Sequence, residues 1–154
     1  SVNSDDSQGV SQENIYGPRV NVKYKNGTKS VSVNEYVTMV LAKRFESGDE
    51  TETLKAMGIM IRTDIYRVMG DEMSVDSETL GMEYFTKNVM KNEWGNNFEE
   101  YYNHVNDSVM STGQMVITYN NNLIDAKYSK RRFPVRNFWE RIMHIWCRQT
   151  ARKI

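Results

Sequence analysis

The chain has few of the residues that build disulfides and metal centres. Its 154 residues include one cysteine, Cys147, and two histidines, His104 and His144. A single cysteine excludes an internal disulfide and a zinc site built on paired cysteines. His144 and Cys147 lie three residues apart, but two ligands without a third or fourth are more typical of a helix surface than of a metal site. The sequence therefore predicts no metal and no cofactor.

Long apolar runs are also missing. The chain has no stretch of about 18 apolar residues and no signal-peptide pattern, so we expect any attachment to a membrane to come from a segment outside this chain. A glycine-rich phosphate loop, a nucleophile elbow and an H-E-x-x-H pair are absent as well. With 39% hydrophobic and 11% aromatic residues, 154 residues suffice for one core, so we expect one globular domain.

The formal net charge of zero hides an uneven distribution. Residues 127–154 carry nine lysines or arginines and one acid, whereas residues 1–126 carry 11 basic and 19 acidic groups. A basic tail of this kind can bind nucleic acid, anionic cell-wall polymer or anionic lipid, or it can be a solvated segment. The rest of the chain has no aromatic platform interleaved with basic residues, which argues against nucleic acid as the partner.

The first half of the chain predicts an arm, a hairpin and a helix. Residues 1–18 are polar and rich in Ser, Asn and Asp, as in a disordered linker or arm. Apolar and polar residues alternate on both sides of Asn26-Gly27, which predicts a β-hairpin because this dipeptide tolerates the positive φ angles of a tight turn. Ser32 and Glu35 then form a capping box that opens a helix. Its apolar stripe comprises Val33, Tyr36, Val37, Val40 and Leu41, and the next position on the stripe is Arg44.

A second capping box, from Ser47 to Glu50, predicts a helix that runs to about Met69. This helix is apolar over a wide face, so we expect it to be largely buried. Gly58 within it costs about 1 kcal/mol relative to alanine, which close packing on a neighbour usually offsets. The apolar face comprises Leu54, Ala56, Met57, Ile59, Met60, Ile61, Ile65 and Val68.

The second half predicts shorter elements. Residues 78–90 can form one short helix, and a clearer one follows Asn97, which can cap it together with Glu100, and ends at Gly113. Residues 114–128 indicate a strand, an asparagine turn and a second strand. The fold class is therefore α+β, with small β-hairpins packed on three to four helices and no internal repeat.

Acidic residues are plentiful near the start of the second helix. Glu46, Asp49, Glu50 and Glu52 lie where negative charge favours the helix dipole, so we interpret them as capping and solvating residues. His104 lies on the aromatic helix predicted after Asn97, and we interpret it as a partly exposed helix residue and not as a catalytic base.

Three ordered segments, residues 33–45, 52–63 and 106–128, are similar to a known family. The first contains an acidic-aromatic pair, Glu35-Tyr36, the second a Leu-Lys-Ala run that ends in Arg62-Thr63, and the third leads into the predicted strand pair. Together they resemble the stage II sporulation protein D family, also called SpoIID/LytB, over residues 20–128. The resemblance implies a domain that acts on bacterial cell-wall glycan, outside the cytoplasm.

The resemblance also implies where the chemistry should lie. Active family members are lytic transglycosylases that cleave peptide-free glycan strands, and their acid/base glutamate corresponds to Arg44. A guanidinium stays charged up to about pH 12, so it cannot donate a proton to a glycosidic oxygen. Glu46, two residues on, takes the place of a family proline and projects in a different direction, so it is a weak candidate for a substitute. The expected ligand-binding residues are Arg44, Arg62, Gln114 and Tyr128, and Arg44 can pair with a carboxylate, contact an anionic or hydroxyl-rich ligand, or simply extend to solvent at a helix end.

The chain departs from the family after Tyr128. The family's Ser-Gly-Gly-type segment and its glycine- and histidine-rich stretch are absent. Two explanations for residues 129–154 remain open. One is a changed reading frame, because suitable codons for residues 140–154 read in another frame give a family-like sequence. The other is a basic amphipathic helix that docks through Phe138, Ile142 and Ile145.

The sequence thus predicts a domain that binds peptidoglycan glycan strands, or regulates other cell-wall hydrolases, and has no catalytic activity. One alternative is an active lytic transglycosylase in sporulation or cell-wall remodelling that uses another carboxylate. A second alternative is a basic-tailed polyanion binder.

Overall fold

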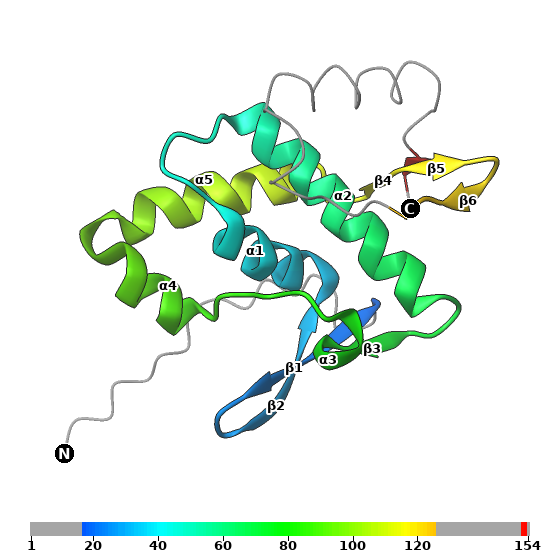
Figure 1. The fold of residues 1–154 in the computed structure, drawn as a ribbon, viewed down its shortest axis with the longest axis horizontal. Coiled ribbons are helices and arrows are strands. Elements are labelled where there is room, and N and C mark those ends of the chain that lie inside the picture. The colour runs from blue at the N-terminus through cyan, green and yellow to red at the C-terminus, as the bar shows by residue number, and fades with distance from the viewer. Residues whose placement is uncertain (1–16, 126–151, 154) are drawn as a thin grey trace.

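The computed structural model describes residues 17–125 and 152–153 (Figure 1). Outside the described residues lie most of the predicted arm, most of the basic tail, Tyr128 and the His144–Cys147 pair. The end of the arm, from residue 17, and a short strand near the C-terminus are described. Within the described part, no helix is long and apolar enough to cross a membrane.

The first sheet begins with the predicted hairpin. Strands β1 (Arg19–Tyr24) and β2 (Gly27–Ser32) pair antiparallel, and Gly27 adopts a φ of 129°, which favours glycine. A third strand, β3 (Ser74–Asp76), lies parallel to β1 on its other edge, so the strand order is β2-β1-β3. The sequence did not predict this strand, because three residues are too few to show an alternating pattern.

Two helices that follow the hairpin pack against each other. Helix α1 (Val33–Arg44) begins after Ser32, whose hydroxyl accepts a hydrogen bond of 3.1 Å from the Glu35 N–H, as the capping box predicts. Helix α2 (Thr51–Met69) ends at the predicted residue. A Cβ added at Gly58 would lie 3.9 Å from Val37 of α1, which confirms close packing at this glycine.

The predicted capping box at the start of α2 is wrong. Glu50 precedes the helix without capping it through its side chain, and Ser47 lies in a turn instead. The Asp49 carboxylate closes this turn by accepting a 2.8 Å hydrogen bond from the Glu46 N–H. The short acidic side chain thus stabilises the loop, and the helix begins two residues later.

The prediction of a single helix over residues 78–90 is also wrong. The chain forms one turn, α3 (Ser77–Leu80), which ends at Gly81 in the left-handed region with a φ of 63°. It then runs irregularly to Thr86, whose hydroxyl caps α4 (Lys87–Trp94). Glycine and threonine therefore act as a stop and a start signal that divide the stretch.

The boundaries of the last helix differ slightly from the prediction. A 3₁₀ turn, η1 (Gly95–Asn97), leads into α5 (Phe98–Ser111), and the Asn97 side chain makes no capping bond. The helix ends before Gly113. The small size of this glycine allows close packing against Asn34. A Cβ there would lie only 3.0 Å from the Asn34 amide nitrogen of α1.

Short strands follow α5. β5 (Thr118–Tyr119) and β6 (Asn122–Leu123) form the predicted hairpin around Asn120 and Asn121, which have φ angles of 48° and 65°. β4 (Met115–Val116) pairs with β7 (Arg152–Lys153), a pairing that the sequence did not predict. The α+β class, with small hairpins packed on helices, is confirmed.

The core lies between α1, α2, α5 and the first sheet. Tyr36, Leu41, Leu54 and Ile65 are fully buried there, together with Val20 and Val22 of β1. Figure 1 shows α1 enclosed by α2, α5 and the segment that carries α3 and α4. The C-terminal end of α1 therefore meets several other segments at one place, which is where the cavity described next is found.

Candidate functional site

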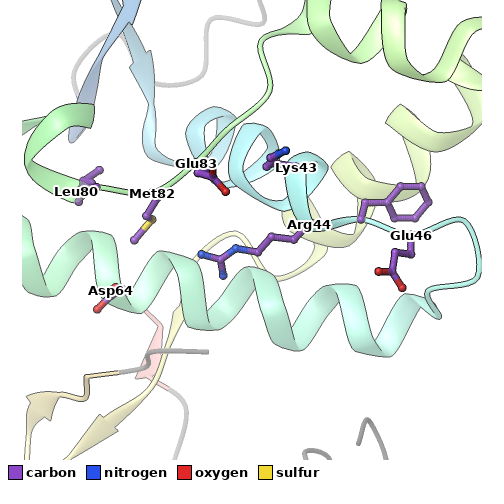
Figure 2. A pocket seen from close by; sticks show the side chains of 9 residues that line it. Lys43, Arg44, Glu46, Asp64, Leu80, Met82 and Glu83 are labelled. Carbon is purple, nitrogen blue, oxygen red and sulfur yellow. The ribbon is translucent and has the colours of Figure 1, made fainter. Parts of the chain in front are cut away.

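A cavity of about 560 Å³ lies at the C-terminal end of α1 (Figure 2). Three segments build it: the end of α1 with the residues that follow it, the middle of α2, and the segment that begins at the end of α3. The lining residues are Lys43, Arg44, Phe45, Glu46, Asp64, Leu80, Gly81, Met82 and Glu83. The wall thus combines two cations with three carboxylates and several apolar groups.

Arg44 is the last residue of α1 and is half-buried in this cavity. A cation in the last turn is favoured by the helix dipole. Figure 2 shows its side chain extending between α1 and α2 toward Met82, whereas the Glu46 carboxylate lies well apart from the guanidinium and is directed toward α2. Arg44 already has an interaction within the protein. The arginine that the sequence singled out therefore faces the cavity, and Glu46 does not reach toward the same place.

The other charges of the wall have their own partners. Asp64 accepts two hydrogen bonds from Arg67, at 3.1 Å from Nε and 2.7 Å from Nη2, so its negative charge is balanced from the same helix. The Lys43 ammonium lies 4.9 Å from the centre of the Phe85 ring, within the range of a cation–π contact. Arg44 and Glu46 also have interactions within the protein.

A buried hydroxyl lies on the same helix, outside the cavity lining. Tyr36 is fully buried, and among the described residues its hydroxyl has no hydrogen-bond partner. Its ring lies 5.5 Å from that of Tyr84, the residue after Glu83. Burial raises the pKa of Tyr36, and the positive charge of Arg44 opposes this rise.

Tyr36→Phe should raise the free energy of unfolding by about 1 kcal/mol, because it removes a desolvated hydroxyl that gains no hydrogen bond in return. Urea denaturation followed by circular dichroism measures the change. Val37→Ala, at the next buried position of α1, is the opposite control and should lower stability by about 1–3 kcal/mol. A loss of stability in Tyr36→Phe would show that the hydroxyl has a partner, such as an ordered water.

Arg62 lies elsewhere, at the junction of α1, α2, α5 and β4. Its side chain is fully buried, and burial lowers the pKa of the guanidinium to about 10. Nε donates to the Asn34 side-chain oxygen at 2.9 Å, Nη1 to the Met115 carbonyl at 3.1 Å and Nη2 to the Val109 carbonyl at 3.0 Å. Asn34 in turn donates to the Gly113 carbonyl at 3.1 Å. This network holds the end of α5 and the start of β4 against the two long helices.

The structure thus separates the residues that were expected to form one site. Arg44 lines the cavity, whereas Arg62 does not, and Gln114 is exposed in the turn before β4. Tyr128 lies outside the described residues. Contact of Arg62 or Gln114 with a ligand stays a prediction, since each lies apart from the cavity lining. The structure also places His104 as expected, half-exposed on α5, with Nε2 3.0 Å from the Asp49 carbonyl.

Two residues of functional interest could not be identified from their patterns. Tyr36 occupies an ordinary apolar position of the α1 stripe, and nothing in the sequence shows that its hydroxyl is unpartnered. Asn34 lies between the capping box residues, yet its amide joins α1 to both Arg62 and Gly113. The only sequence signal for the network was the resemblance carried by Arg62-Thr63. Thr63 belongs to it too, because its hydroxyl accepts from the Ile117 N–H at 2.9 Å.

The fold and the cavity define an α+β domain whose first helix ends in a charged cavity. Comparison with known proteins gives the family: the stage II sporulation protein (SpoIID) family model matches residues 23–119, and the chain belongs to this family. It is 30% identical over 116 residues to stage II sporulation protein D of Bacillus subtilis (strain 168), which covers 68% of this chain and 34% of that protein. It is 26% identical over 111 residues to the Bacillus amyloliquefaciens protein of the same name, covering 67% and 32%.

These comparisons confirm the resemblance seen in the sequence. They place the chain in a family of bacterial sporulation proteins. The chain spans about a third of the length of the curated relatives that it matches.

Proposed function

We propose that this domain binds the glycan strands of the bacterial cell wall without cleaving them, and that it acts outside the cytoplasm. The observation that carries the proposal is the place of Arg44. The cavity receives a guanidinium at the position to which the family resemblance assigns an acid/base glutamate. The domain therefore has a cavity that can hold a ligand, but an arginine stands there in place of the acid/base glutamate.

Cleavage of a glycosidic bond needs a group that can donate and accept a proton within hydrogen-bond reach of the bond. Arg44 stays protonated and cannot alternate between the two roles. Glu46 is exposed and points away from the Arg44 guanidinium, and Asp64 is held by Arg67. These features support a binding role, in which the domain occupies strands or presents them to other cell-wall hydrolases.

Glu83 also lines the cavity, so an active enzyme that uses this carboxylate is the alternative. Glu83→Gln keeps the size of the side chain and removes its charge. The alternative predicts that the wild-type protein cleaves peptide-free strands and that Glu83→Gln does not. If both proteins bind the strands and cleave them equally or not at all, the alternative fails.

Binding is measured by co-sedimentation of the purified protein with insoluble peptide-free glycan strands. We expect the protein to sediment with the strands and to be released by soluble strands of the same composition. Recovery of all the protein in the supernatant at every strand concentration would contradict the proposed function.

A further inference from the structure

The tip of the β1–β2 hairpin carries a residue pair that can react without an enzyme. Asn26 is the only asparagine of the chain that is followed by a glycine. In such a pair the backbone nitrogen of the glycine can attack the side-chain carbonyl carbon of the asparagine. Glycine has no Cβ to obstruct this approach, so the pair cyclises faster than an asparagine that precedes any other residue. Asn26 and Gly27 therefore supply both reacting groups.

The Asn26 side chain is exposed and is not held by the protein. Residues 25–28 are all exposed, and Figure 1 shows the hairpin projecting away from the helices. Within the described part of the chain, no hydrogen bond restrains the Asn26 amide. Asn21 of β1, in contrast, donates to the Asp76 carboxylate at 2.9 Å. The Asn26 amide is thus free to turn toward the backbone of the next residue.

The backbone at Gly27 can open locally. Gly27 pairs with Tyr24 as the last pair of the hairpin, next to the two-residue turn. Strand β3 pairs only with residues 19–21 of β1, so the tip is a two-stranded ribbon without a third strand beside it. Such a ribbon is marginally stable, and its end opens at little cost in free energy. Local opening therefore frees the Gly27 nitrogen for attack while the base of the sheet stays paired.

We propose that Asn26 is a site of spontaneous deamidation, which converts it to aspartate and isoaspartate as the protein ages. The inference does not depend on the proposed function. The Gly27 nitrogen loses its proton and forms a bond to Cγ of Asn26, and the side-chain nitrogen leaves as ammonia. Water then opens the resulting succinimide at either carbonyl, which gives aspartate or, with the main chain rerouted through Cγ, isoaspartate. The reaction consumes water and needs no cofactor, oxidant or reductant.

Either product changes the tip of the hairpin. Both products add a negative charge beside Lys25, and isoaspartate also lengthens the backbone of the turn by a methylene group. The length of a hairpin turn fixes the register of its strands, so the longer backbone should disrupt the Tyr24–Gly27 pair. Val20 and Val31 pair at the base of the hairpin and are fully buried, so the change should stay confined to the tip.

The experiment incubates the purified protein in mildly alkaline buffer and follows each asparagine by peptide mapping and mass spectrometry. Isoaspartate is quantified separately by enzymatic methylation with an isoaspartyl methyltransferase. Asn26 should convert about tenfold faster than any other described asparagine, because it alone is followed by a residue without a side chain. The rate should rise with pH, since the attacking nitrogen must lose its proton.

Asn26→Gln should abolish isoaspartate formation at the tip, because glutamine would have to form a less favourable six-membered ring. Asn121→Gln is the matched control, since Asn121 is an exposed asparagine in the turn of the β5–β6 hairpin and precedes another asparagine. This variant should still deamidate at position 26 at the wild-type rate.

A comparison of the folded wild-type protein with the same protein unfolded in urea needs no variant. Conversion of Asn26 should be detectable in both states, and slower in the folded one. Conversion in urea alone would overturn the proposal, because the tip would then not open locally. Equal rates at Asn26 and at the other exposed asparagines of the folded protein would overturn it as well.

Discussion

Replacing Arg62 with methionine should lower the free energy of unfolding by about 3–5 kcal/mol. Methionine fills a similar length but cannot donate, so it leaves the Asn34 side-chain oxygen and the Met115 and Val109 carbonyls without the donor that they now share. The Asn34 oxygen and the Met115 carbonyl keep their desolvation cost and lose this donor, whereas the Val109 carbonyl still accepts from the N–H and the hydroxyl of Thr112. Urea denaturation monitored by far-ultraviolet circular dichroism gives the difference.

Arg67→Met is the matched control for this substitution. Arg67 lies on the same helix, is about one third exposed and pairs with Asp64, so its removal should cost about 1 kcal/mol or less. A similar small loss in both variants would mean that the buried network contributes little to stability, and that Arg62 is free to serve a ligand.

Arg44→Glu should fold normally and lose most of its affinity for peptide-free glycan strands. The substitution reverses the charge that faces the cavity, so binding of a carboxylate-bearing strand should weaken by more than tenfold. The free energy of unfolding should change by about 1 kcal/mol or less, because the residue is only half-buried at the end of a helix. Titration with soluble peptide-free strands measures the affinity, and urea denaturation followed by circular dichroism measures the stability.

The same variant tests whether the cavity can regain cleavage of glycan strands. A carboxylate here is partly desolvated, which favours the protonated form that a general acid needs. We expect at most trace cleavage from Arg44→Glu alone, and appreciable cleavage only when the family-like reading frame of residues 129–154 is restored as well. Cleavage by the restored tail with Arg44 still in place would assign the chemistry to another carboxylate.

The parts of the fold that could be predicted are those with local signals. The Asn26-Gly27 dipeptide specifies a tight turn, Ser32 caps α1 through its own hydroxyl, and the asparagines at 120 and 121 adopt the positive φ angles of a hairpin. Gly58 was expected to pack closely, and it does. In each case one or two adjacent residues carry the physical reason.

The errors arose where two local signals competed. Ser47 and Glu50 have the spacing of a capping box, but the Asp49 carboxylate binds the Glu46 N–H first and keeps the chain in a turn. Residues 78–90 have helical periodicity, but Gly81 can take the left-handed conformation that ends a helix. Strand β3 could not be found locally, because it is defined by pairing with β1, more than fifty residues earlier.

The candidate site could be predicted only as far as Arg44. Its position at the end of the α1 stripe and the family resemblance both marked it, and the structure places it at a cavity. The separation of Arg62 from Arg44 could not be foreseen, because it depends on which face of α2 meets α5 and β4. The Tyr36 hydroxyl has no hydrogen-bond partner within residues 17–125, and this too depends on three-dimensional packing that apolar periodicity does not specify.

The central claim is that the domain holds glycan strands and leaves them intact, and its most direct test is a count of strand ends. Peptide-free strands are incubated with the purified wild-type protein at concentrations that give saturated binding, and the products are examined by mass spectrometry. The expected result is bound strands of unchanged length with no new 1,6-anhydro sugar ends. Anhydro ends that accumulate with time and with protein concentration would contradict the account, because they would require a proton-transfer group that Arg44 cannot provide.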